Sequence, residues 1–160
     1  MYLLDANVFI DAKNRYYGMD FAPGFWEWLH QAHRQGLVYT VRAVADEIVP
    51  GDELSTWVKA LPAGFVHDPV ASDAPHLSSL AVWAQASTHY RPDAIAEFLR
   101  SADYRLVAQA KTLGYTVVTH ETADSNIKRK IKIPEACAHI GVSYVNPFDV
   151  LRKHKARLTI

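Results

Sequence analysis

Short apolar segments alternate with longer segments of helical pattern along this sequence, and that alternation restricts the possible folds more than any other feature. Residues 2–6 begin as a continuous rather than an alternating apolar run, which indicates a strand that is buried on both faces. Residues 37–41 and 115–120 are rich in β-branched side chains, which favour strands. Two further strands are predicted, at 64–69 and 142–145.

Helical patterns fill the intervals between these strands, and several of them end at a glycine, as helices commonly do. The expected helices cover residues 7–17, 25–36, 43–49, 52–60, 73–88, 93–113, 134–141 and the chain from 146 onward. Strands that alternate with helices predict an α/β fold. We expect a three-layer α/β/α sandwich around a central parallel sheet of four to five strands, forming a single domain over residues 1–160.

Charge is distributed unevenly although the net charge is zero. Residues 1–100 carry 7 Lys and Arg against 12 Asp and Glu, whereas residues 101–160 carry 10 against 5. The basic residues gather in KRKIK (128–132) and RKHKAR (152–157). An acidic pocket beside a basic rim would suit a metal-dependent enzyme that acts on a polyanion. Taken alone, however, the charge pattern is explained better by two solvated faces.

The composition also predicts where the protein resides. No apolar run approaches the length of a membrane helix, and the first residues do not form a secretory signal because Asp5 interrupts them. Cys137 is the single cysteine, so an internal disulfide cannot form. We therefore expect a protein of the reducing cytoplasm, without a membrane partner.

Carboxylates follow several of the predicted strands. Asp5 ends the first strand, Glu47 lies in the helical segment after the second, and Asp103 lies near the start of the helical stretch that leads into the fourth. Glu121 follows the fourth strand directly, and Asp124 comes three residues later. Strand ends and helix starts share one edge of a parallel α/β sheet, where ligands bind. The sequence thus predicts an acidic site at this edge.

Clustered carboxylates repel one another unless a cation holds them ionised. Oxygen donors without Cys or His favour Mg²⁺ or Mn²⁺ over Zn²⁺. One or two such ions can promote phosphodiester cleavage by activating water and stabilising the transition state. The predicted cofactor is therefore Mg²⁺ or Mn²⁺.

Four stretches, taken in order, resemble the acidic motifs of the PIN-domain nucleases: DANVFI, ADEI, ADYRLVAQA and a TxE after VV. The resemblance spans nearly the whole chain. It implies metal-dependent cleavage of single-stranded RNA by the toxin of a toxin–antitoxin pair, with a cognate antitoxin as partner and a homodimer as the assembly. It also implies that Asp5, Glu47 and Asp103 bind metal or position water, while Asn7 and Thr119 support Asp5.

The fourth acid departs from the family pattern. Glu121 stands where relatives often carry Asp, and Asp124 is a second candidate that is followed by Ser instead of Phe. The next segment, SNIKRKIKIPEAC, is also atypical, which indicates a divergent PIN-like branch. It begins near the proposed site, so Lys128 and Lys130 are expected to contact RNA phosphates, pointing the same way if the segment is extended.

Two other classes of function compete with the nuclease. A non-cleaving RNA- or protein-binding module could keep the same fold, although the presence of all the acids argues against it. A phosphoryl-transfer enzyme with a nucleophilic Asp is disfavoured, because DANVF lacks a DxD pair and no glycine-rich phosphate loop occurs.

Overall fold

The computed structural model describes residues 1–159 and contains a five-stranded sheet in which every neighbouring pair of strands is parallel. The strand order is β3-β2-β1-β4-β5. The strands are β1 (Tyr2–Leu4), β2 (Val38–Val41), β3 (Val66–His67), β4 (Thr116–Val118) and β5 (Tyr144–Val145). The prediction of an α/β fold with a parallel sheet of four to five strands is confirmed.

The central strand β1 is short and fully enclosed. Leu3 pairs with Tyr39 of β2 on one side and with Val117 of β4 on the other. Leu3 and Val117 have no exposed surface, as expected for a strand with helices on both faces. The continuous apolar run at the start of the chain is explained by this position.

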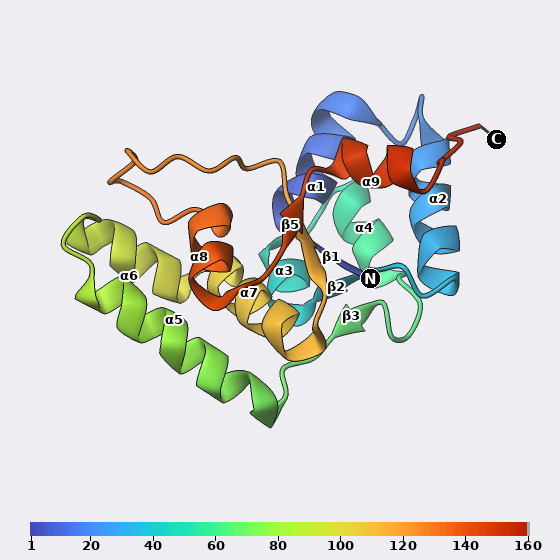
Figure 1. Ribbon diagram of the computed structural model, residues 1–160. Helices are drawn as coiled ribbons and strands as arrows, with labels where there is room; N and C mark the ends of the chain where they lie inside the picture. The colour runs from blue at the N-terminus through green and yellow to red at the C-terminus, as the bar shows by residue number, and fades with distance from the viewer. Residues whose placement is uncertain (160) are drawn as a thin grey trace.

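Helices cover both faces of the sheet (Figure 1). On one side lie α2, α4 and α9, and on the other lie α5, α7 and α8. The helices are α1 (Ala6–Asp11), a π-helical turn η1 (Ala12–Tyr16), α2 (Pro23–Arg34), α3 (Arg42–Glu47), α4 (Glu53–Lys59), a 3₁₀ turn η2 (Ala71–Asp73), α5 (Ala74–Ala86), α6 (Pro92–Arg100), α7 (Ala102–Leu113), α8 (Ile133–Ile140) and α9 (Pro147–Lys153).

One predicted helix is wrong, because residues 93–113 form two helices instead of one. The chain breaks at Ser101, whose backbone is extended, with φ −79° and ψ 160°. The Ser101 hydroxyl accepts a hydrogen bond from the backbone N–H of Tyr104 at 3.4 Å and donates one to the carbonyl of Phe98 at 2.7 Å. This serine therefore caps α7, and Asp103 lies in the first turn of that helix.

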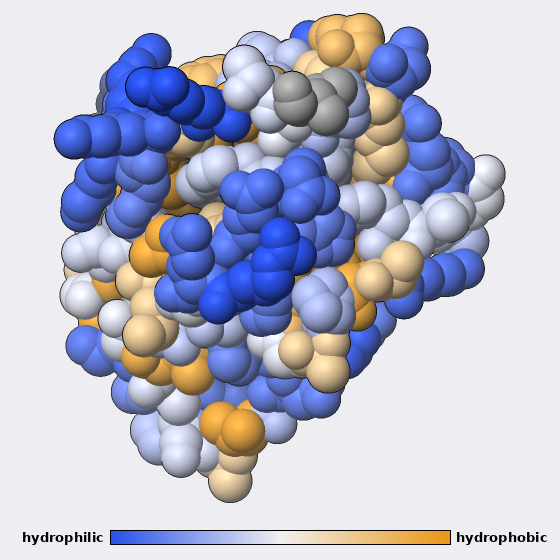
Figure 2. Space-filling model, turned by 90° about the vertical axis from the view of Figure 1, so that its right-hand side faces the viewer, coloured by the Kyte–Doolittle hydropathy of each residue, from blue (hydrophilic) through white to orange (hydrophobic). Residues whose placement is uncertain are grey.

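The surface over α2 and α9 mixes hydrophilic residues with small, separate apolar groups (Figure 2). In the part of the chain that the structure describes, no helix is long and apolar enough to cross a membrane.

Candidate active site

The sheet reverses its order of strand addition between β1 and β4. The chain passes from β1 outward to β2 and β3, then returns to place β4 on the other side of β1. In open parallel sheets, ligands bind beyond the carboxyl ends of the strands at such a switch point. Asp5 and Thr119 are the residues that follow β1 and β4 there, and the two strands are joined by a hydrogen bond of 3.1 Å from Asp5 N–H to the Val118 carbonyl.

Asp5 is held by the helix that it begins. Asp5 is 2% exposed as a residue, and its Oδ1 accepts hydrogen bonds from the backbone N–H groups of Asn7 at 2.5 Å and Val8 at 3.3 Å. These contacts make Asp5 the N-cap of α1. Its other oxygen, Oδ2, is buried and has no hydrogen-bond partner among the described residues. One carboxylate oxygen is therefore committed to the fold, and one is free to bind a ligand.

Thr119 and Asn7 both lie close to Asp5. Thr119 is 1% exposed, and its hydroxyl accepts a hydrogen bond of 3.1 Å from the N–H of Glu121. The exposed Asn7 contacts Asp5 through its backbone N–H, not through a side-chain bond within the described part of the chain. The orienting contact that was expected of the Asn7 side chain is thus made by its backbone.

The remaining acids come from three other segments. Glu47 is the last residue of α3, and its Oε1 accepts a hydrogen bond of 3.1 Å from the N–H of Ala102, at the start of α7. Asp103 follows in the first turn of α7. The carboxylate of Glu121 receives the N–H of Ile133 at 3.2 Å on Oε2 and the Lys130 ammonium at 3.2 Å on Oε1.

A cavity of about 220 Å³ lies among these segments. Its walls come from the start of α1, the end of α3, α6, the α6–α7 junction and the segment before α8. The lining residues are Ala6, Asn7, Ile10, Glu47, Ala94, Glu97, Phe98, Ser101, Asp103, Arg129, Lys130 and Ile131.

The acids interact electrostatically. Burial raises the pKa of Asp5 to about 6, and the Glu121 carboxylate adds to the rise. The nearby Thr119 hydroxyl partly offsets it, although no hydrogen bond of regular geometry joins Thr119 to Asp5. Burial likewise raises the pKa of Asp103 to about 7, and Asp5, Glu121 and Glu47 raise it further, while Lys130 lowers it. All four acids therefore share one region of negative potential, the arrangement that binds cations.

The donor atoms of the four acids are of the kind that hard divalent cations prefer. They offer only oxygen donors, and the buried Asp5 Oδ2 lacks any other partner. Their side chains do not converge as they stand: among the described residues, no three His, Cys, Asp or Glu side chains form a group that could hold a metal ion. Glu47 and Glu121 each have one carboxylate oxygen occupied by another partner, Ala102 N–H for Glu47 and the Lys130 ammonium for Glu121.

Asp124 and Lys128 lie outside this cavity. Asp124 is exposed, and its Oδ1 accepts the N–H of Asn126 at 3.0 Å in a local turn. Neither Asp124 nor Glu121 lines the cavity, but the Glu121 carboxylate raises the pKa of both Asp5 and Asp103, whereas Asp124 contributes to neither shift. Lys128 is exposed on the same segment. The geometry therefore favours Glu121 over Asp124 as the fourth acid.

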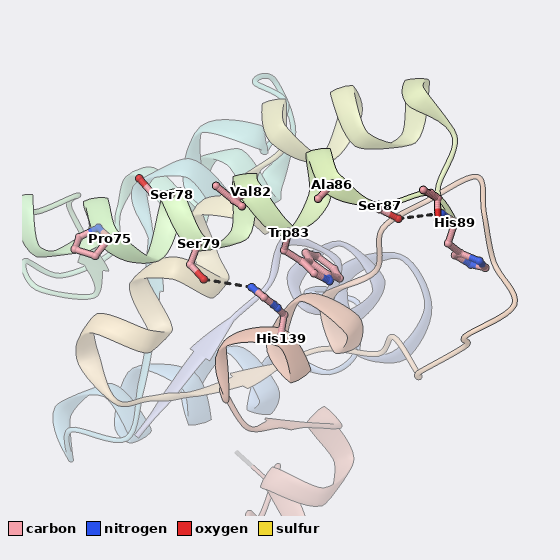
Figure 3. A pocket seen from close by; sticks show the side chains of 10 residues that line it. Pro75, Ser78, Ser79, Val82, Trp83, Ala86, Ser87, His89 and His139 are labelled. Atoms are coloured by element: carbon pink, nitrogen blue, oxygen red, sulfur yellow. Dashed lines mark hydrogen bonds between the residues drawn. The ribbon is translucent and has the colours of Figure 1, made fainter.

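A larger hollow of about 740 Å³ runs along α5 and contains none of these acids. Trp83 of α5 stacks on His139 of α8 with ring centroids 5.1 Å apart, and the Ser79 hydroxyl hydrogen-bonds to His139 Nε2 at 3.2 Å (Figure 3). No Asp, Glu, Lys or Arg is among its lining residues. We call this hollow the α5 groove. Its size is unrelated to the predicted chemistry, so the smaller acidic cavity is the candidate active site.

Two parts of the site were not anticipated from the sequence. Ser101 lines the cavity and caps α7, and the N–H of Ile133 fixes Glu121. The cap at Ser101 has a signal in the sequence, because a serine just before a new apolar pattern is a common helix start. The second joins residues from two segments across the site, and no local pattern predicts such a contact.

Comparisons with known proteins agree with the fold. Curated proteins give no significant match. Among solved structures, a chain from the structure of FitAB bound to an IR36 DNA fragment is similar with a TM-score of 0.54 and 18% identity, over 92% of this chain and 96% of that one. At this identity the likeness shows a shared fold and no more. A family model described as a domain of unknown function, DUF4411, matches residues 2–158, and the chain belongs to this family.

Proposed function

We propose that this protein is a metal-dependent endoribonuclease that cleaves single-stranded RNA and acts as the toxin of a toxin–antitoxin pair. The observation that carries the proposal is the buried Asp5 carboxylate, which keeps Oδ2 without a hydrogen-bond partner among the described residues, at the switch point of the sheet and in the electrostatic field of Asp103 and Glu121. A buried, unpaired carboxylate oxygen is costly for folding. A ligand that binds it explains its retention.

The four acids would hold Mg²⁺ or Mn²⁺, which supplies Lewis-acid stabilisation of the phosphodiester transition state when bound. The α1 N–H groups fix the orientation of Asp5, and the nearby Thr119 hydroxyl favours its ionised form. Ser101 holds the turn of α7 that carries Asp103. Acids that do not bind the ion directly would position the attacking water.

The segment 128–132 supplies the contact with RNA in this proposal. Arg129 and Lys130 line the cavity, and Lys128 is exposed beside them. Basic side chains at the rim would bind the phosphates on either side of the scissile bond and make binding weaken as salt increases. Contact of Lys128 and Lys130 with RNA remains a prediction.

The partners are proposed on separate grounds. The fold that the chain shares with FitAB, which was solved bound to a DNA fragment, supports a component of a toxin–antitoxin system and thus a cognate antitoxin. The α5 groove has no Asp, Glu, Lys or Arg on its walls, and protein interfaces are depleted of charged residues at their centres. It is the surface on which we expect a homodimer to form.

Incubation of the purified protein with single-stranded RNA in Mn²⁺, Mg²⁺ or EDTA tests the activity. We expect cleavage with either metal, none in EDTA, and a loss of at least about 100-fold for Asp5→Asn, because several kcal/mol of transition-state stabilisation depend on the ion. Asp46→Asn is the matched control, since Asp46 is an exposed acid beside Glu47. Cleavage that persists in EDTA, or that Asp5→Asn leaves intact, would refute the mechanism.

A non-cleaving RNA- or protein-binding module is the second candidate. The observation that favours it is the separation of the acids, which form no ready metal-binding group among the described residues. This alternative predicts RNA binding that survives Asp5→Asn, with no turnover in Mn²⁺ or Mg²⁺.

A further inference from the structure

The acidic cavity contains a cation that belongs to the chain itself. The Lys130 ammonium lies 3.2 Å from Glu121 Oε1, and the Lys130 side chain is 51% exposed, whereas that of Glu121 is 12% exposed. Lys130 therefore reaches inward from the surface to a largely buried carboxylate. Of the two basic side chains that line the cavity, Lys130 is the one that forms an ion pair with an acid within the described chain.

The backbone around Lys130 is fixed at both ends, so this orientation is built into the fold. On one side, the Arg91 N–H donates to the Lys128 carbonyl at 3.0 Å, and His89 Nε2 hydrogen-bonds to the Ile127 carbonyl at 2.9 Å. On the other side, Ile131 is 2% exposed and anchors the segment in the core. Only a short stretch between these anchors is left to vary, and Lys130 lies within it.

The charge of Lys130 acts on more than its direct partner. Its ammonium lowers the pKa of Asp103, and Glu121, Asp103 and Asp5 together raise the pKa of Lys130 against the opposing effect of burial. One positive charge thus offsets part of the repulsion among acids that come from separate segments. The same contact keeps Glu121 turned toward Lys130, consistent with the separation of the acids noted above.

We propose that Lys130 is a resident counter-ion of the acidic cavity, and that a divalent cation binds there only by displacing the Lys130 ammonium from Glu121. The inference rests on the proposed function, because it assumes that the four acids are the metal ligands. An ammonium and a divalent ion repel each other and compete for the same carboxylate oxygens. Each therefore weakens the binding of the other to Glu121. Lys130 therefore weakens metal binding and sets the metal concentration at which the site fills.

Calorimetric titration of Mn²⁺ into protein dialysed against EDTA tests the proposal. We expect Lys130→Met to bind Mn²⁺ at least about tenfold more tightly than the wild type, because the competing charge is gone. Lys130→Arg keeps the charge and should remain within about threefold of the wild type. Lys128→Met removes an exposed lysine from the same segment and should shift Mn²⁺ affinity by less than about twofold, since exposed charges are screened by salt.

Melting in EDTA and in Mn²⁺ provides a second readout that also reports folding. In EDTA, Lys130→Met should melt below the wild type, because the acids lose their counter-ion. Saturating Mn²⁺ should restore it by a larger shift than it gives the wild type. A Lys130→Met protein that binds Mn²⁺ no more tightly than the wild type, or more weakly, would overturn the proposal.

Parallel cleavage assays separate this inference from the proposed function. If the wild type binds Mn²⁺ and cleaves RNA, but Lys130→Met shows no gain in affinity, the role of Lys130 is refuted and the nuclease stands. If Lys130→Met gains affinity but the wild type cleaves no RNA, the nuclease is refuted and the counter-ion stands. Absence of Mn²⁺ binding in every variant would overturn both.

Discussion

The acidic cavity and the α5 groove contrast in size and in chemistry. The groove measures about 740 Å³ and has no acid or base of the Asp, Glu, Lys or Arg type on its walls. The cavity measures about 220 Å³ and is lined by Glu47, Glu97, Asp103, Arg129 and Lys130. The groove has no such charges to hold together, whereas the acids in and around the cavity raise the pKa of Asp103.

This contrast supports the acidic cavity, not the α5 groove, as the candidate active site. A buried carboxylate with a raised pKa destabilises the native state at neutral pH, so a protein that needed only stability would gain by losing it. Asp5 and Asp103 both have raised pKa values at the switch point of the sheet. Shifted pKa values at the ligand-binding edge of a sheet are better evidence for a functional site than the volume of a cavity is.

Asp103→Asn should produce the largest change, a loss of RNA cleavage of at least about 100-fold, because it removes a proposed metal ligand while preserving side-chain size. Rates with single-stranded RNA in Mn²⁺ measure the effect. Asp93→Asn is the control, since Asp93 is also in a helix first turn but is exposed on α6. Equal loss in both variants would show that the cavity has no special role.

The stability of the wild type in EDTA should fall as the pH rises from about 5 to about 8. The pKa values of about 7 for Asp103 and about 6 for Asp5 exceed the usual value in an unfolded chain, so the native state holds more protons across this window. Stability is therefore highest at the acidic end, and the penalty should amount to a few kcal/mol.

Urea unfolding of the wild type and of Asp103→Asn at both pH values isolates the contribution of this carboxyl. The variant should lose less stability between pH 5 and pH 8 than the wild type loses. Identical pH dependence in the two proteins would contradict the raised pKa of Asp103.

Ser101→Ala should destabilise the protein by about 1 kcal/mol, because it removes the N-cap of α7 at the wall of the cavity. Ser78→Ala makes the same chemical change on the exposed wall of the α5 groove and should be nearly neutral. Urea unfolding at one pH compares the two. If Ser78→Ala proves the more destabilising, the groove is under tighter structural constraint than the cavity.

Val82→Glu should have the smallest effect on catalysis. Val82 is 66% exposed in the α5 groove, so an acid placed there should leave cleavage within about twofold and unfolding within about 0.5 kcal/mol of the wild type. Light scattering measures its effect on the proposed dimer separately. A large drop in cleavage by a monomeric variant would show that groove and cavity are coupled.

Much of this molecule follows from local sequence patterns. The apolar run that ends at Asp5 predicts both the first strand and an acid at the sheet edge, because parallel strands buried on both faces end at a common edge. The fourth strand likewise predicts that Glu121, which follows it, lies at the same edge of the sheet. Asp5 directly follows β1, whereas β4 ends at Val118 and Glu121 comes three residues later.

The features that the sequence did not predict depend largely on tertiary contacts. The pattern over 93–113 is helical throughout, and the break at Ser101 depends on a single side-chain cap that competes with continuation of the helix. Lys130 was expected to face RNA, but its ammonium turns to Glu121, nine residues earlier in the chain. The backbone on either side of Lys130 is held by the hydrogen bond from Arg91 to Lys128 and by the burial of Ile131. No periodicity in the segment predicts these contacts.

The most direct test of the central claim is a crystal structure of the protein with Mn²⁺, in which anomalous scattering locates the ion. We expect a peak at the acidic cavity, about 2.0–2.2 Å from Asp5 Oδ2 and within reach of Asp103, with the Lys130 ammonium turned away from Glu121. A cavity without a peak at saturating Mn²⁺, or an ion bound only elsewhere, would contradict it.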